Sequence, residues 1–125
     1  MASPDGQDRA ALARQFTDEM YEGYRYLART INYRAKLFLE MVTMHGGVGA
    51  AQLLLQGRDA SDGFTRLWEE HQLDRSVEAS ILRSKYLVLF TDQERDVARR
   101  RLEAHGFDAD AFLAGNDADE DVHNG

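Results

Sequence analysis

The 125-residue chain contains no cysteine, and its single proline, Pro4, lies close to the N-terminus. Without cysteine the protein has no disulfide framework, thiolate zinc site or cysteine nucleophile, a composition that fits a reducing compartment. Without an internal proline no central segment is interrupted, so continuous helices are the simplest interpretation. The composition therefore predicts a cytoplasmic, helical protein without disulfide bonds.

Long apolar runs are also lacking. The longest unbroken stretches, residues 53–55 and 86–90, fall far short of the roughly 20 apolar residues that span a bilayer. Residues 1–8 are polar and lack the cationic segment and apolar run of a signal peptide. We therefore expect neither membrane association nor secretion.

The net charge of −7 is concentrated at the two ends of the chain. Residues 1–8 and 108–125 contain eight of the 22 acidic residues and no Lys or Arg, which leaves 14 acids and all 15 bases in residues 9–107. Charged segments with little apolar content do not bury enough surface to fold. We therefore predict a disordered N-terminus over 1–8, a helical domain over 9–107, and a mostly disordered acidic tail over 108–125.

Apolar side chains in residues 8–31 recur every three or four positions, the spacing of one helix face. These side chains are Leu12, Phe16, Met20, Tyr24, Leu27 and Ile31. Gly23 lies within this predicted helix, where glycine costs up to about 1 kcal/mol of helix propensity. Its presence suggests a close approach by another helix at that position.

The same spacing, together with residues that begin and end helices, predicts five further helices. Asn32 is expected to cap the second, Gly46 and Gly47 to end it, and a short third helix to stop at Gly57. Ser61 is expected to cap the fourth, Asp74 or Ser76 to begin the fifth, and a capping box of Thr91 with Glu94 to begin the sixth. Gly106 followed by Phe107 fits a Schellman stop, and residues 109–114 add one turn. The predicted fold class is all-α, a compact bundle of five or six short helices.

No set of residues predicts a catalytic, cofactor-binding or metal site. The four histidines, His45, His71, His105 and His123, include no pair three or four apart, as a helical two-His zinc motif requires. Three of them end predicted helices, where a cation meets the negative end of the helix dipole. The alternative is that they gather into a site with Glu40, Glu70 or Asp74.

Basic residues raise the alternative of nucleic-acid binding. Arg83, Lys85, Arg95 and Arg99 are the candidate phosphate contacts. The four arginines at 95, 99, 100 and 101 surround the predicted helix, which favours a solvated helix with local ion pairs over a phosphate-binding stripe. Arg101 falls within the apolar arc beside Glu94, so we predict a partly buried stem and an internal ion pair there.

Tyrosines are dense near the first helix and cannot all lie on its core face. Tyr21, Tyr26 and Tyr33 are the candidate residues of a partner or self-association surface. The alternative is that each ring packs on the body of the protein while its hydroxyl reaches water.

An ordered set of residues between about 38 and 107 carries a resemblance. It includes Gly46-Gly47-Val48, Leu54-Leu55, Gly63-Phe64, Leu67-Trp68-Glu69, Leu73-Asp74, Ser76-Val77-Glu78, Leu89-Phe90-Thr91 and Arg101-Leu102. This pattern resembles a family of small bacterial all-helical proteins with no assigned activity. The resemblance implies a helical fold unit and implies no catalytic residue or cofactor.

Taken together, these patterns predict a non-enzymatic binding or accessory module that acts through a protein partner or through self-association. A nucleic-acid-associated accessory protein that uses Arg83, Lys85, Arg95 and Arg99 is the alternative. A third interpretation is an enzyme whose site is shared across a dimer interface.

Overall fold

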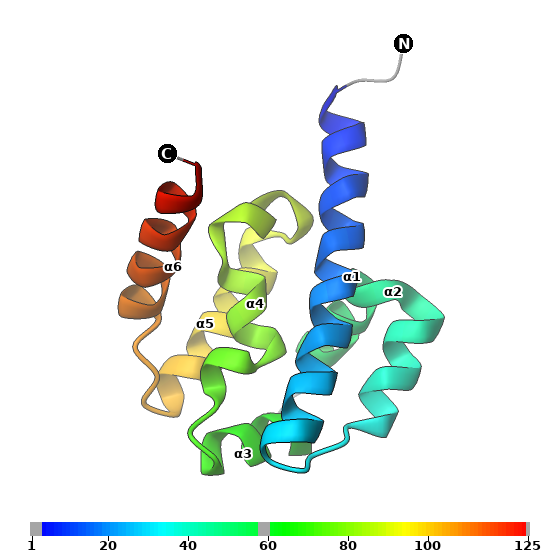
Figure 1. Cartoon of the computed structure of the whole chain (residues 1–125), viewed down its shortest axis with the longest axis vertical. Helices are drawn as coiled ribbons and strands as arrows, with labels where there is room; N and C mark the ends of the chain where they lie inside the picture. The colour runs from blue at the N-terminus through cyan, green and yellow to red at the C-terminus, as the bar shows by residue number, and fades with distance from the viewer. Residues whose placement is uncertain (1–3, 58–60, 125) are drawn as a thin grey trace.

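The computed structural model describes residues 4–57 and 61–124, and the side chains of residues 8–57 and 61–116. These residues form six α-helices and two short 3-10 helices, with no strand among them, which confirms the predicted all-α class (Figure 1). The α-helices are α1 (Pro4–Thr30), α2 (Lys36–Gln56), α3 (Asp62–Glu69), α4 (Val77–Leu82), α5 (Asp92–Ala104) and α6 (Ala109–Asn124). The 3-10 helices are η1 (Leu73–Arg75) and η2 (Ser84–Leu89).

The core forms around the middle of α1, which packs on α2 and η2. Phe16 is fully buried, and its ring makes edge contacts with Tyr86 and Phe90 at centroid distances of 5.0 and 5.2 Å. Ile81 of α4 and Leu102 of α5 are also fully buried.

Phe16, Met20 and Leu27 of the predicted apolar face are buried in this core, and Leu12 and Ile31 pack against it. Tyr21 and Tyr26 also pack against the core, whereas Tyr24 of the predicted face is not among the residues in the core cluster.

Helices α1 and α2 cross at a kink. Gly46 has a φ of 76°, the left-handed conformation predicted for it. It connects two helical segments of α2 that were predicted as separate helices. The next amide, of Gly47, donates a hydrogen bond to Thr17 Oγ1 at 2.9 Å, and Thr17 Oγ1 donates to the Ala13 carbonyl at 3.0 Å. A Cβ on Gly47 would lie 2.7 Å from Thr17 Cα, so this glycine permits the crossing. The close approach predicted at Gly23 is wrong, because a Cβ there would meet no atom within 4 Å.

The predicted helix caps at Ser61, Ser76 and Thr91 are confirmed. Ser61 accepts a hydrogen bond from the Phe64 amide at 3.1 Å, Ser76 accepts one from the Ala79 amide at 3.1 Å, and Thr91 forms the capping box with Glu94. Gly106 is left-handed, with a φ of 80°. The predicted Asn32 cap is wrong. Asn32 has a φ of 54°, and α2 begins later, after Ala35, because residues 31–35 form the turn between α1 and α2.

The predicted disorder at the two ends is not confirmed over the described residues. Helix α1 already begins at Pro4, where proline is compatible with a first helical turn. Helix α6 continues to Asn124, beyond the single predicted turn. Its start is stabilised because Asp108 accepts a hydrogen bond from the Ala111 amide at 3.0 Å and Phe112 contacts Phe107 at 5.4 Å. Residues 1–3 and 125 lie outside the described part of the chain.

We expect Gly47→Ala to lower the free energy of unfolding by about 1–3 kcal/mol, because the added methyl overlaps the Thr17 backbone. Gly23→Ala is the matched control. It should raise the free energy of unfolding by about 0.5–1 kcal/mol, since it adds helix propensity without a clash. Urea unfolding measures both, and shifts of the same sign would contradict this account of the crossing.

Candidate functional site

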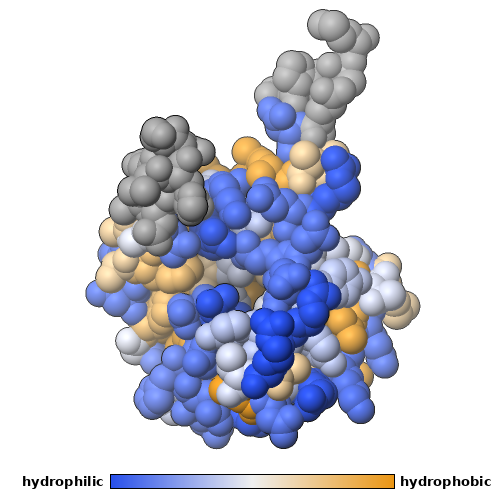
Figure 2. Space-filling model, in the orientation of Figure 1, coloured by the Kyte–Doolittle hydropathy of each residue, from blue (hydrophilic) through white to orange (hydrophobic). Residues whose placement is uncertain are grey.

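A groove of about 1100 Å³ opens between the C-terminal half of α1 and the segment formed by α3, η1 and α4. The first turns of α2 and two residues of α6, Phe112 and Asn116, border it. In Figure 2 the most hydrophilic side chains form a strip over the lower half of α1, beside a hollow in the surface. The groove therefore joins an apolar interior to a strongly polar rim.

Tyrosines contribute much of the groove lining. The Tyr26 ring lies under the Arg75 guanidinium, with 4.0 Å between the Arg75 Cζ and the ring centroid, and the Tyr33 ring lies 5.4 Å from the Arg66 Cζ. Burial raises the pKa of the Tyr33 hydroxyl, and the positive charge of Arg66 opposes part of that rise. Tyr21 lies elsewhere, with its hydroxyl 3.3 Å from Thr43 Oγ1 on α2. The structure thus brings two of the three candidate partner residues to one groove, and their role in binding stays a prediction.

Four cations on the groove rim form no ion pair among the described residues. They are Arg29 at the end of α1, Arg34 and Lys36 at the turn into α2, and Arg75 in η1. Arg34 donates a hydrogen bond to Asn32 at 2.5 Å. Two carboxylates, of Asp62 and Asp74, also line the groove without an ion pair in the described part of the chain. The lining as a whole has five basic and five acidic residues, and those without an ion pair in the described ranges are four cations and two carboxylates.

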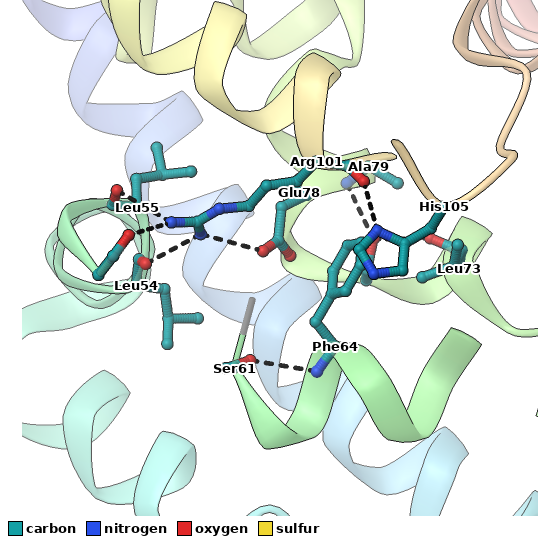
Figure 3. A network of polar contacts seen from close by, with 11 residues as sticks. Leu54, Leu55, Ser61, Phe64, Leu73, Glu78, Ala79, Arg101 and His105 are labelled. Carbon is teal, nitrogen blue, oxygen red and sulfur yellow. Dashed lines mark hydrogen bonds and ion pairs between the residues drawn. The ribbon is translucent and has the colours of Figure 1, made fainter. Parts of the chain in front are cut away.

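A buried carboxylate closes the inner side of the groove. Glu78 of α4 is only 3% exposed, and its Oε2 lies 3.5 Å from Arg101 Nη1, with no hydrogen bond to a described residue (Figure 3). Desolvation raises the pKa of Glu78, while the positive charges of Arg101 and His105 offset part of the rise. Apart from its place in the resemblance, Glu78 has no local sequence signal, because burial of a carboxylate depends on neighbours distant in the chain.

Arg101 holds the end of α2 as well as Glu78. Its guanidinium donates to the carbonyl oxygens of Leu54 at 3.0 Å, Leu55 at 3.2 Å and Gly57, the last carbonyls of the helix (Figure 3). The predicted partly buried stem and internal ion pair are present, but the partner is Glu78. The predicted neighbour, Glu94, is instead used in the capping box with Thr91.

His105 extends this network toward α3. Its Nδ1 lies 2.8 Å from the Arg101 carbonyl, and because a carbonyl only accepts, Nδ1 carries the proton and donates. The centroid of the imidazole ring lies 4.8 Å from that of the Phe64 ring and 5.3 Å from that of the Trp68 ring. These contacts give His105 a packing role at the end of α5, in agreement with its predicted position.

The four candidate phosphate contacts have acidic partners within the chain. Arg83 lies 2.5 Å and Lys85 3.8 Å from Glu19, which also accepts a hydrogen bond from Tyr86 at 3.0 Å. Arg95 pairs with Asp92 and donates to the Leu87 and Phe90 carbonyls at 2.9 and 2.8 Å. Arg99 pairs with Glu103 at 3.3 Å and Asp110 at 3.0 Å. A phosphate would have to compete with these carboxylates, and nucleic-acid binding stays a prediction.

Two further properties bear on function. Among the described residues, no group of three or more His, Asp or Glu side chains is placed to hold a metal ion. Of the helices in the described ranges, α2 alone has the length and apolar composition to cross a membrane, and it is interrupted by the kink at Gly46. Length and composition are weak evidence for such a role.

No known protein family, curated protein or solved structure matches the chain. The resemblance to small bacterial helical proteins therefore stays a prediction, and the groove has to be interpreted from its own residues.

We expect Arg101→Met to lower the free energy of unfolding by about 3–5 kcal/mol, because it leaves a buried carboxylate without its counter-charge. Arg100→Met is the matched control. That neighbour is mostly exposed and pairs only with Asp96, so a change within about 0.5 kcal/mol is expected. Equal losses in urea unfolding would show that Arg101 has no special role.

The raised pKa of Glu78 also predicts a pH dependence. The folded protein holds the Glu78 proton to a higher pH than the unfolded chain, so ionisation of Glu78 lowers stability as pH rises from the ordinary glutamate range through the raised value. Glu78→Gln removes this loss and leaves Arg101 bound to its three carbonyls. Over that window the stability of the wild type should fall relative to the variant. Parallel stability curves from urea unfolding at a series of pH values would refute the assignment.

Proposed function

We propose that the protein is a non-enzymatic binding or accessory module that holds a segment of a protein partner in the groove between α1 and the α3–η1–α4 segment. The observation that carries this proposal is the groove itself, with its apolar depth, its tyrosines and its unpaired rim cations. The partner is another protein or a second copy of this chain.

The shape of the groove favours a peptide segment over a small molecule. Its volume of about 1100 Å³ lies at the upper end of the roughly 300–1,000 Å³ of small-molecule pockets, and residues of five α-helices and η1 line it. Apolar depth beside a polar rim suits an amphipathic helix, which binds by laying its apolar face into a groove.

The first half of α2 extends the apolar surface at the edge of the groove. Leu37, Met41 and Met44 follow at i, i+4 and i+7, which places them on one helix face. Leu37 and Met44 are each 77% exposed, although α2 is apolar along most of its length. A helix that is apolar on all sides is normally buried. This exposed face supports a partner surface continuous with the groove.

The polar groups around the groove support binding more than catalysis. Glu78, its most buried acid, is committed to Arg101, which in turn caps α2. Glu19 is committed to Arg83 and Tyr86. Among the described residues both acids take part in contacts between helices, which supports a structural role for them.

Site-specific photocrosslinking tests the proposed function. A photoreactive phenylalanine replaces Leu37 at the edge of the groove, or Leu87 on η2 as a control outside it, since both leucines are largely exposed. In cells that naturally make the protein, we expect a discrete adduct from the Leu37 variant and none of that mass from the Leu87 variant. An adduct of twice the 14.2 kDa chain mass would identify a second copy. Identical adducts, or none from either variant, would contradict the proposal.

A further inference from the structure

We infer that the acidic C-terminal segment of a second copy binds the basic rim of the groove, so that chains associate head to tail. This inference rests on the proposed function and names the partner of the same groove. The rim is defined as the four cations Arg29, Arg34, Lys36 and Arg75.

The rim contains four of the six cations that form no ion pair among the described residues, and the other two, Arg9 and Arg14, lie in the first half of α1. The lysines and arginines of η2, α5 and the α4–η2 junction pair with carboxylates of the same chain, as described for Arg83, Lys85, Arg95 and Arg99, and for Arg100 and Arg101. The rim cations come from three segments that line one groove. Arg75 covers Tyr26, which lies one helical turn before Arg29 on α1. Unpaired cations attract a carboxylate-rich segment.

The chain itself contains a segment of the opposite charge. Residues 108–125 include six acids and no Lys or Arg. Asp108 is used at the start of α6, and Asp110 pairs with Arg99. Four further acids, Asp117, Asp119, Glu120 and Asp121, fall within five consecutive positions of the sequence. No other stretch of this length in the chain is as acidic, which makes it the complementary ligand for the rim.

The direction of α6 favours a rim on another molecule, even though its first turns border the groove at Phe112 and Asn116. Helix α6 runs toward the same end of the molecule as the N-terminus, whereas the C-terminal end of α1 lies at the opposite end (Figure 1). The C-terminal segment of one copy therefore points away from its own rim and toward a neighbour. Two different surfaces meet in such a contact, so association continues into chains or closes into rings and does not stop at a symmetric dimer.

Sedimentation velocity of the full chain tests the inference. In salt of about 0.01 M, where the Debye length is about 30 Å, we expect a mass that rises with concentration beyond twice 14.2 kDa. In about 1 M salt, where the Debye length is about 3 Å, the protein should be monomeric.

Charge reversal identifies the two surfaces. A rim variant carries Arg29→Glu, Arg34→Glu and Lys36→Glu, and a tail variant carries Asp117→Lys, Asp119→Lys, Glu120→Lys and Asp121→Lys. Each alone should associate at least about tenfold more weakly than the wild type, and mixing the two should restore association, because both charge pairs are then complementary again. The matched control, Arg9→Glu, Arg14→Glu and Arg100→Glu, changes the net charge equally outside the rim and should retain association. Circular dichroism confirms that each variant is folded.

Several results would overturn the inference. They are a monomeric wild type at low salt up to about 1 mM protein, equal losses in the rim and control variants, and a mixture that does not associate. An association that stops at two copies would also exclude the head-to-tail arrangement. The two proposals can fail separately. If the protein is monomeric but the Leu37 photocrosslinking variant still gives a discrete adduct of another mass, this inference is wrong and the proposed function is supported.

Discussion

The guanidinium of Arg101 is the contact on which the arrangement of the other helices depends. The last carbonyls of a helix have no partner within it, and a buried carboxylate needs a counter-charge, so both are costly unless another group supplies donors. One side chain on α5 meets both needs, because arginine carries five donors in a rigid fork. It ends α2 at Leu54, Leu55 and Gly57, and it allows Glu78 of α4 to be buried. His105, at the C-terminal end of α5, donates a hydrogen bond to the Arg101 carbonyl, and its ring packs on Phe64 of α3.

The groove follows from where α1 is held. Its middle is fixed to α2 by the Thr17 contact with Gly47, to η2 by the aromatic cluster around Phe16, and to the α4–η2 junction by the pair of Glu19 with Arg83. Beyond these contacts, the C-terminal turns of α1 extend past α4 and leave the groove beside them. Those turns carry tyrosines and arginines in place of small apolar residues. The groove therefore results from the contacts that hold the middle of α1 and from the large polar side chains of its C-terminal turns. Four cations at its rim have no ion-pair partner among the described residues.

Local signals were sufficient for the helix boundaries at Ser61, Ser76 and Thr91 and for the left-handed Gly46 and Gly106, because caps and turns depend on residues within a few positions. Local signals failed where the contact of a residue depends on a neighbour distant in the chain. The sequence predicted a helix contact at Gly23 and a helix end at Gly47, yet Gly47 meets another helix and Gly23 does not. In the same way, Glu94 was the nearer acid for Arg101, but Glu78 is its partner, since α4 packs on α5.

The sequence by itself determined the all-α class, most helix starts and the separation of an acidic end from a nearly neutral body, because periodicity, capping and charge counts are properties of the chain. It also indicated that the first-helix tyrosines exceed what one core face holds. Only the tertiary structure decided which charges are compensated and which remain, and that Tyr26, Tyr33 and Arg75 share one groove. The physical reason is that pairing and burial depend on distances between helices, which are set by packing contacts such as that of Thr17 with Gly47, where a single methyl group would not fit.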